Sequence, residues 1–380
     1  MDFSFSSDQR MLADSVERYV SARYLPDVRI VRGADGAQQR EMHRRAFADM
    51  GLFGLTIGED WGGFGGGGTE TAIVMEAFGK GLVTESWVGS ALVCASLLAQ
   101  SGNEVLKAEL LPQIASGELQ VALAHAEPQA RHALSDVETT ATAQGEHFVL
   151  NGRKSLVVQG GNAKRLLVSA RTSGSRRDEE GISLFVLDPE AEGVSCVRYA
   201  TLDGSSAADF EFKNVHVLAA AMLHEPGGAL PMLEHSVDAG ATALCAEAVG
   251  IMSALLSATL DYVKTRKQFG VNLSSFQALQ HRLVDMHMHI EQARSLSWLA
   301  ASKVNALDTS ERKRAVSAAK WRVGTAARLV GKEAIQMHGG IGMTDELIVG
   351  HYVKRLMAIE QTFGDTGYHL KRFIQVAYVH

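Results

Sequence analysis

The stretch HFVLNGRKSLVVQ at residues 147–159 decides the fold prediction, because it is short, rich in Val, Leu and Phe, and interrupted by Asn and Gly. Segments of the same kind follow at residues 165–171, 181–188 and 208–217. Such runs, separated by Gly, Asp and Asn, are typical of strands joined by turns. The sequence therefore predicts a β domain of about six to eight strands in the middle of the chain.

Both flanks of this β region have a helical period. The first extends to about residue 120, and the second begins after the Glu-Pro-Gly-Gly sequence at residues 225–228. In the second flank, apolar residues recur at steps of four and three, which indicates the buried stripe of a long helix. The residues of this stripe are Leu279, Leu283, Met286, Ile290, Ala293, Ala300 and Val304.

The predicted fold class is therefore α-helical with an inserted β domain. We expect an N-terminal helical domain at residues 1–120, a middle β domain at residues 121–224 and a C-terminal helical domain at residues 225–380. The second and third domains are expected to be a β-barrel or sandwich and a helical bundle.

Composition excludes several classes of function. The 380 residues include 37 basic and 43 acidic side chains, and the formal net charge of −6 argues against binding to a nucleic-acid backbone. No signal peptide and no long uninterrupted apolar run are found, so we expect a cytoplasmic protein without a membrane span. Three scattered cysteines suit neither a disulfide framework nor a metal site. The spacing of His281, His287 and His289 also indicates no metal site.

A glycine cluster in the second flank, QMHGGIGMTDE at residues 336–346, follows a helical stretch. Adjacent glycines let the main chain approach a ligand closely and present N–H groups to it. Gly339 by itself would also serve as an ordinary helix C-cap. Both interpretations stay open on this motif alone.

Upstream of the cluster lies YVKTRKQFGVNLSSFQALQHRLVDM, residues 262–286. The pattern Arg-x-x-Phe-Gly, then Phe-Gln, then Gln-x-x-Gly-Gly-x-Gly resembles the C-terminal signature of acyl-CoA dehydrogenases. The helix–β–helix order, the Glu-Pro pair at residues 127–128 and an Asn-Gly-x-Lys turn at residues 151–154 fit the same family. The sequences CAEAVG (245–250), HYVKRL (351–356) and FGDT (363–366) resemble the small subunit of pimeloyl-CoA dehydrogenase-type enzymes.

The resemblance implies the acyl-CoA dehydrogenase fold, FAD as cofactor and the α,β-desaturation of an acyl-CoA thioester. It also implies that residues near the C-terminus hold the adenine and pyrophosphate end of FAD across a subunit interface. An arginine fork suits a pyrophosphate, an aromatic ring packs on flat groups, and amides and glycines supply neutral contacts. The residues that match this role are Arg266, Phe269, Gln277, Gln336, Gly339 and Gly340.

The sequence departs from the family at the positions of the catalytic base and of the flavin-contacting motifs. The Glu-Gly pair that carries the family's usual base falls on Phe363 and Gly364, and the alternative base position falls on Gly240. Neither position holds a carboxylate. The family's Thr-Glu-Pro is Ala-Glu-Pro at residues 126–128, its Gly-Ser-Asp is Arg-His-Ala at residues 131–133, and its flavin-covering Trp-x-Thr is Leu-Val-Val at residues 156–158.

Three other acids are candidates for a relocated base. Asp365 could instead cap the chain near Thr366, Asp238 could favour a helix start, and Glu247 could pair with an arginine such as Arg266. The catalytic residue therefore stays unknown.

These departures favour a heteromeric enzyme. The chain would complete the FAD site of an unlike, base-bearing dehydrogenase subunit in an α2β2 assembly. The alternatives are a self-sufficient homotetramer and a non-catalytic scaffold of the same fold. The resemblance further implies an electron-transfer flavoprotein as electron acceptor and suggests dicarboxylic, cyclic or steroid acyl-CoAs, although no residue identifies the substrate.

Overall fold

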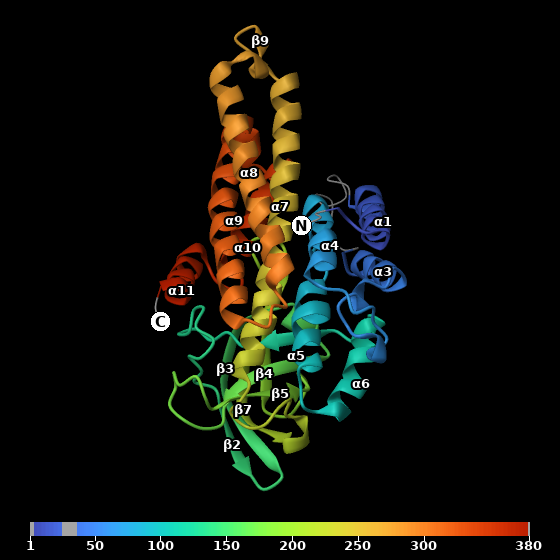
Figure 1. Cartoon of the computed structure of the whole chain (residues 1–380), viewed down its shortest axis with the longest axis vertical. Coiled ribbons are helices and arrows are strands. Elements are labelled where there is room, and N and C mark those ends of the chain that lie inside the picture. The colour runs from blue at the N-terminus through green and yellow to red at the C-terminus, as the bar shows by residue number, and fades with distance from the viewer. Residues whose placement is uncertain (1–3, 25–35, 379–380) are drawn as a thin grey trace. The chain divides into compact units, whose positions relative to one another are not determined.

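The computed structural model describes residues 4–24 and 36–378. Helices come first, strands follow, and long helices end the chain (Figure 1). The chain divides into two compact units, one formed from residues 1–36, 67–83 and 241–380, and the other from residues 37–66 and 84–240. The expected helix–β–helix order is confirmed.

The unit that contains the sheet begins with short helices. These are α3 (Gly36–Asp49), η1 (Leu52–Gly54), η2 (Glu59–Trp61), the π-helical η3 (Trp87–Cys94), α5 (Ala95–Ala99) and α6 (Glu104–Ala115). The strands are β1 (Val121–Ala124), β2 (Thr140–Gln144), β3 (His147–Val158), β4 (Arg165–Arg171), β5 (Ile182–Leu187), β6 (Val194–Ala200) and β7 (Ser206–Leu218). The turns η4 (Gly160–Asn162) and η5 (Ala219–Ala221) follow β3 and β7.

In the described residues these strands form one seven-stranded sheet, which agrees with the expected number of strands. The order is β1-β4-β2-β3-β7-β6, and β5 pairs with β4. Apolar side chains from one face form the core, with Leu150, Leu166, Val168, Phe185, Phe210 and Phe212 among its buried members. The Asn-Gly-x-Lys sequence at residues 151–154, expected as a turn, instead lies inside β3, where the register with β7 shifts between Leu150 and Gly152. The shift comes from a bulge in β7, where Lys213 and Asn214 lie opposite Asn151, so the Asn-Gly sequence stays within the strand.

The helical unit contains α1 (Ser7–Arg23), α4 (Gly68–Gly81) and most of α7 (Leu230–Thr265). A small hairpin, β8 (Lys267–Gln268) and β9 (Val271–Asn272), and the turn η6 (Leu273–Ser275) join α7 to α8 (Gln277–Lys303). The chain then forms α9 (Thr309–His338), η7 (Gly339–Met343), α10 (Ile348–Gln361) and α11 (Thr366–Tyr378). Figure 1 shows α8 and α9 running side by side, with β9 at the outer end of the α7–α8 hairpin.

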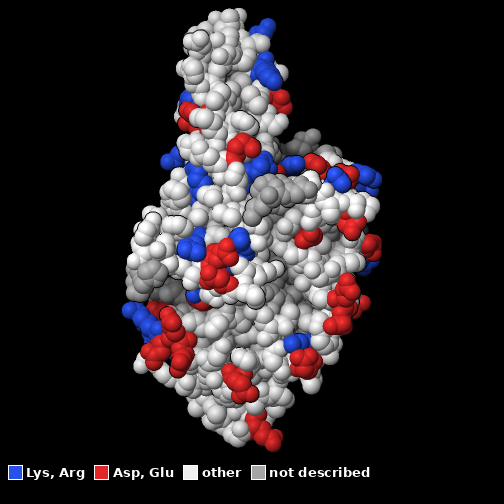
Figure 2. Space-filling model, viewed as in Figure 1, with Lys and Arg blue, Asp and Glu red and all other residues white. Residues whose placement is uncertain are grey.

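The predicted apolar stripe on α8 is confirmed at its centre, where Leu283, Met286, Ile290, Ala293 and Ala300 are buried. Helix α7 is the one helix among the described residues that is long and apolar enough to cross a membrane. However, 67% of its most apolar window is buried in the protein, and the core helix of a soluble protein has the same composition. The face shown in Figure 2 carries basic and acidic side chains in mixture, and the outer end of the α7–α8 hairpin is mostly uncharged.

Candidate functional site

The hairpin between α7 and α8 presents an aromatic ring to solvent. Arg266 follows the last residue of α7, and the turn between β8 and β9 consists of Phe269 and Gly270, both with positive φ, 54° and 81°. This turn holds the Phe269 side chain 91% exposed, with its ring edge-on to Phe276 at 6.2 Å. Burying a phenylalanine contributes about 1.5–3 kcal/mol, and this ring is available for such burial by another molecule.

Arg266 and Gln277 are exposed in the same region. Gln277 is the first residue of α8. Neither side chain makes an ion pair or a hydrogen bond with any residue in the described part of the chain. Both polar groups are therefore available to a ligand or a partner.

The glycine cluster lies at the end of α9. Gly339 is the C-cap residue, with φ 68° and ψ −145°, and its N–H donates to the carbonyls of Ile335 and Gln336. The C-cap role considered from the sequence is thus present. Gly340 has no positive φ, and a Cβ added there would meet no atom within 4 Å, so the fold of this chain does not require glycine at that position. An exposed glycine that the chain itself does not require suits close approach by another molecule.

The helical unit brings these segments together at one end. The Tyr262 hydroxyl donates to the carbonyl of His338 at 3.3 Å, which places the last turn of α7 beside Gly339. Arg266 lies one turn further along, and its N–H donates to the Tyr262 carbonyl at 2.8 Å. An ion pair between Arg282 and Glu333 joins the first part of α8 to the last part of α9. The expected cofactor residues on α7, α8 and α9 therefore share one region of the surface.

The two positions expected for a base hold no acid. Phe363 lies in the turn between α10 and α11, with φ 57°, and its side chain is partly buried. Gly240 is buried in α7.

The structure confirms one of the roles considered for two of the alternative acids and corrects the other. Glu247 is 1% exposed and receives two hydrogen bonds from the Arg355 guanidinium, at 2.5 and 2.8 Å, so it pairs with an arginine as suggested, although that arginine is Arg355 and not Arg266. Helix α7 starts at Leu230, which places the buried Asp238 in its third turn, beyond the range in which the helix dipole favours an acid. The interpretation of Asp238 as a helix-start residue was therefore wrong.

Asp365 acts as the cap of α11, one of the roles considered for it. Its Oδ1 accepts from the N–H of Tyr368 at 2.7 Å, and its carbonyl accepts from the N–H of His369 at 3.0 Å. Capping satisfies N–H groups that the first turn of a helix leaves without partners. This engagement holds the carboxylate at the helix end.

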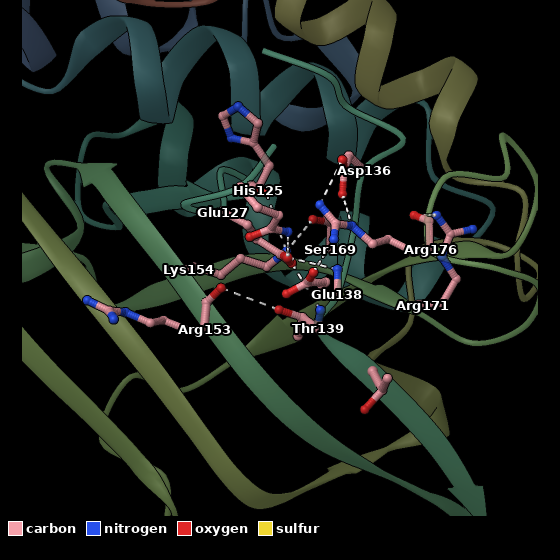
Figure 3. Close-up of polar contacts among 12 residues, drawn as sticks. His125, Glu127, Asp136, Glu138, Thr139, Arg153, Lys154, Ser169, Arg171 and Arg176 are labelled. Atoms are coloured by element: carbon pink, nitrogen blue, oxygen red, sulfur yellow. Dashed lines mark hydrogen bonds and ion pairs between the residues drawn. The ribbon is translucent and has the colours of Figure 1, made fainter. Parts of the chain in front are cut away.

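The sheet unit contains a buried polar cluster that sequence reasoning did not identify (Figure 3). The Lys154 ammonium on β3 lies 2.6 Å from Glu127 Oε1 and 3.0 Å from Ser169 Oγ, and both charged side chains are almost fully buried. Burial, the largest single influence, raises the pKa of Glu127, but the charge of Lys154 and the hydrogen bonds from Lys154, Thr139 and the Glu138 N–H together lower it below its usual value. Burial lowers the pKa of Lys154 to about 8. The pair fixes the loop after β1 against β3 and β4.

Positions that would face a flavin ring are apolar. Leu156 is 52% exposed, with φ 52° and its N–H bonded to Asp209 Oδ1 at 2.9 Å. Val158 is also exposed, whereas Val157 between them is buried. Neither exposed side chain offers a hydrogen bond or a stacking surface. These residues do not fit the ring end of a flavin, whereas the exposed groups at the end of α7, α8 and α9 fit a pyrophosphate and its neighbours.

A separate cavity of about 380 Å³ lies in the sheet unit, lined among others by Lys164, Arg165, Asp188 and Arg198. It includes none of the residues expected to contact FAD and none of the buried cluster around Lys154. Among the described residues, no group of three or more His, Cys, Asp or Glu side chains is arranged to hold a metal.

Comparison with known proteins identifies the family and the fold. Three family models match the chain in order: acyl-CoA dehydrogenase N-terminal domain at residues 6–118, middle domain at residues 122–215 and C-terminal domain at residues 230–377. A probable acyl-CoA dehydrogenase of Bacillus subtilis, YngJ, is 30% identical over 356 residues, which is 91% of both chains. The chain belongs to the acyl-CoA dehydrogenase family, whose members are flavoproteins that bind FAD.

Solved structures agree with this assignment. Butyryl-CoA dehydrogenase from Megasphaera elsdenii is 26% identical, with 98% of each chain covered and a TM-score of 0.89. A variant of the Tcur3481-Tcur3483 steroid ACAD is 26% identical, with 97% of each chain covered and a TM-score of 0.85. The predicted acyl-CoA dehydrogenase fold is confirmed.

Proposed function

We propose that this chain is a subunit of an FAD-dependent acyl-CoA dehydrogenase and completes the FAD site of a neighbouring subunit. The observation that carries the proposal is the set of exposed groups at one end of the helical unit: Arg266, Phe269, Gln277, Gln336, Gly339 and Gly340. Tyr262 and the Arg282–Glu333 ion pair hold the three helix ends that carry them together. The domains of this subunit are those at residues 1–120, 121–224 and 225–380.

Each group has a defined task at the nucleotide end of FAD. The Arg266 fork binds the pyrophosphate, which is anionic and accepts two parallel hydrogen bonds. Phe269 packs on a flat part of the cofactor, and Gln277 and Gln336 hydrogen-bond to neutral groups. Gly339 and Gly340 let the main chain approach closely. When bound, FAD would supply the hydride-accepting group of the reaction, and the residues of this chain would bind and orient it.

The neighbouring subunit is proposed to be an unlike dehydrogenase chain in an α2β2 assembly. Phe363 and Gly240 supply no base, and Leu156 and Val158 supply no polar contact to a flavin ring. A partner subunit that supplies a base and polar contacts to the flavin ring would make one complete site. The similar Tcur3481-Tcur3483 steroid ACAD is named for two proteins, which supports an unlike partner and a bulky acyl-CoA such as a steroid side chain. We also propose that this chain is similar to the small subunits of pimeloyl-CoA dehydrogenase-type enzymes. The proposed electron acceptor is an electron-transfer flavoprotein.

FAD content tests the proposal directly. The chain is purified alone and also coexpressed with its natural neighbouring dehydrogenase subunit, and bound FAD is measured in each preparation. We expect little FAD in the chain alone and FAD in the complex. A yellow chain that alone holds an equimolar amount of FAD and oxidises acyl-CoA would establish the self-sufficient homotetramer. A stable complex without flavin would establish a scaffold.

Arg266→Ala in the complex identifies the binding group. Losing a hydrogen-bonded charge costs about 1.5–3 kcal/mol, so FAD affinity should fall about tenfold to a hundredfold. Arg10→Ala is the matched control, because Arg10 is an exposed arginine on α1. Equal FAD affinity in both variants would contradict the assignment of Arg266.

A further inference from the structure

The cavity of about 380 Å³ in the sheet unit lies along β6, the last strand in the sheet order. Cys196 and Arg198 of β6 pair with Phe210 and Ala208 of β7, which belong to the buried core. Because paired residues point to the same face of a sheet, Cys196 and Arg198 lie on the core side of β6. Both are nevertheless exposed, and the cavity that they line occupies the space beside Phe210.

Two glycines of η4 form the wall beside these residues. A Cβ added at Gly161 would lie 2.9 Å from Cγ and 3.3 Å from Nε of Arg198, and a Cβ added at Gly160 would lie 3.0 Å from Cε2 of Phe210. Contacts this close leave little room for a side chain at either glycine. The Arg198 side chain therefore lies along the backbone of η4, which places its guanidinium at the cavity wall.

The free charges of the cavity are unequal in sign. Its lining includes three basic and two acidic side chains: Lys164, Arg165, Arg198, Asp188 and Glu190. The Arg165 guanidinium pairs with Asp188 at 3.3 Å, which neutralises one charge of each sign. The side chains of Lys164, Arg198 and Glu190 make no ion pair or hydrogen bond within residues 4–24 and 36–378. Two cations and one carboxylate of the lining are therefore available to a ligand.

These three groups define the chemistry of the ligand. The planar fork of Arg198 matches two oxygens of a phosphate group, and the Lys164 ammonium adds a second positive charge. A carboxylate only accepts hydrogen bonds, so Glu190 suits a hydroxyl donor on the same ligand. The cavity volume also lies in the range of small-molecule sites, about 300–1,000 Å³.

We propose that this cavity binds a small phosphate ester that also carries a hydroxyl group, with Arg198 and Lys164 at the phosphate and Glu190 at the hydroxyl. A sugar phosphate and a nucleotide share this chemistry. The site is separate from the proposed FAD contacts, since none of those residues lines the cavity. Failure of either proposal therefore leaves the other standing.

The cysteines of the chain provide a direct readout of occupancy. Cys94 and Cys245 are buried, whereas Cys196 is exposed and lines the cavity. The rate at which the Cys196 thiol reacts with dithiodipyridine, an uncharged disulfide reagent, is measured on the full chain. Ribose phosphate, AMP and inorganic phosphate are the probes, and ribose and succinate are the controls without phosphate. Titration calorimetry gives Kd for each compound.

We expect ribose phosphate and AMP to slow the thiol reaction and to bind about tenfold more tightly than inorganic phosphate, because only the esters bring a hydroxyl to Glu190. The tighter of the two esters identifies the source of the ligand. Ribose and succinate should give no protection. Equal affinity for inorganic phosphate and both esters would overturn the assignment of an ester.

Substitutions test the three groups separately. Arg198→Gln and Lys164→Met should each weaken ester binding about tenfold or more, because each removes a charged hydrogen-bond donor. Lys213→Met, at an exposed lysine on β7 outside the cavity, is the control and should change nothing. Glu190→Ala should weaken the esters but not inorganic phosphate, since it removes an acceptor and a repelling charge together.

Melting temperatures show that each variant is folded, and FAD content of the complex should be the same in all of them. The proposal is overturned if no phosphate compound protects Cys196 or if succinate protects it as well as the esters do. Unchanged ester affinity in both Arg198→Gln and Lys164→Met would also overturn it.

Discussion

The rings of Tyr262 and His338 lie with their centroids 4.4 Å apart, and the Tyr262 hydroxyl donates to the His338 carbonyl. These residues are 76 positions apart in the chain. One precedes Arg266 by a single helical turn, and the other directly precedes the paired glycines. This contact is therefore the link between the two sequence motifs of the proposed FAD site.

Tyr262→Phe tests the link. The variant keeps the ring contact and removes one partly buried hydrogen bond, so the free energy of unfolding should fall by about 0.5–1.5 kcal/mol. FAD affinity of the complex should fall as well, because Arg266 and Gly339 are no longer held in register. Urea unfolding and FAD titration measure the two effects. Tyr378→Phe, at an exposed tyrosine on α11, should change neither.

Phe269→Ala should weaken assembly without weakening the fold. The ring is 91% exposed in the single chain, so its removal costs the folded monomer almost nothing. If the ring is buried against a partner and its cofactor, association should weaken by about 2 kcal/mol or more. Analytical ultracentrifugation of the complex measures the effect. Leu307→Ala, at a fully exposed leucine between α8 and α9, is the control, and equal association of the two variants would count against Phe269.

Stability at alkaline pH should depend on Lys320. Burial lowers the pKa of Lys320 from 10.5 to about 8, against opposing influences from Cys245, Glu360 and Asp365. Between these pH values the unfolded chain holds a proton that the folded chain has released, so the free energy of unfolding rises with pH. The pKa of Lys154 is also lowered to about 8 and contributes with the same sign. The wild type should therefore gain more stability across this window than Lys320→Met, as measured by urea unfolding at several pH values, and parallel curves would contradict the prediction.

Glu127→Gln should strongly destabilise the sheet unit. The substitution leaves the Lys154 ammonium buried without its counter-charge, and breaking a buried pair in this way costs about 3–5 kcal/mol. Glu211→Gln is the matched control, because its pair with Lys213 is solvent-exposed and should change stability by less than about 0.5 kcal/mol. Urea unfolding followed by circular dichroism compares the two variants. A small effect of Glu127→Gln would show that the sheet unit tolerates the unpaired lysine.

Periodicity along the chain correctly predicted the order of helices and strands, because the apolar face of each element is encoded in neighbouring residues. The same periodicity also indicates a buried lysine, Lys320, which the sequence analysis did not identify. Lys320 falls at steps of three and four with Val316, Val323, Ala327 and Val330, all of which are buried. A lysine on such a stripe indicates a buried cation, but it does not indicate which carbonyls it contacts.

What the sequence determined by itself was the class of each segment, the motifs of the family and the absence of an acid at positions 240 and 363. What only the tertiary structure decided was which distant groups meet: Glu247 with Arg355, Tyr262 with His338, and Lys320 with the end of α10. The physical reason is that periodicity shows which face of a helix is buried but not its neighbour. The neighbour depends on the packing of whole helices, to which every contact along their length contributes.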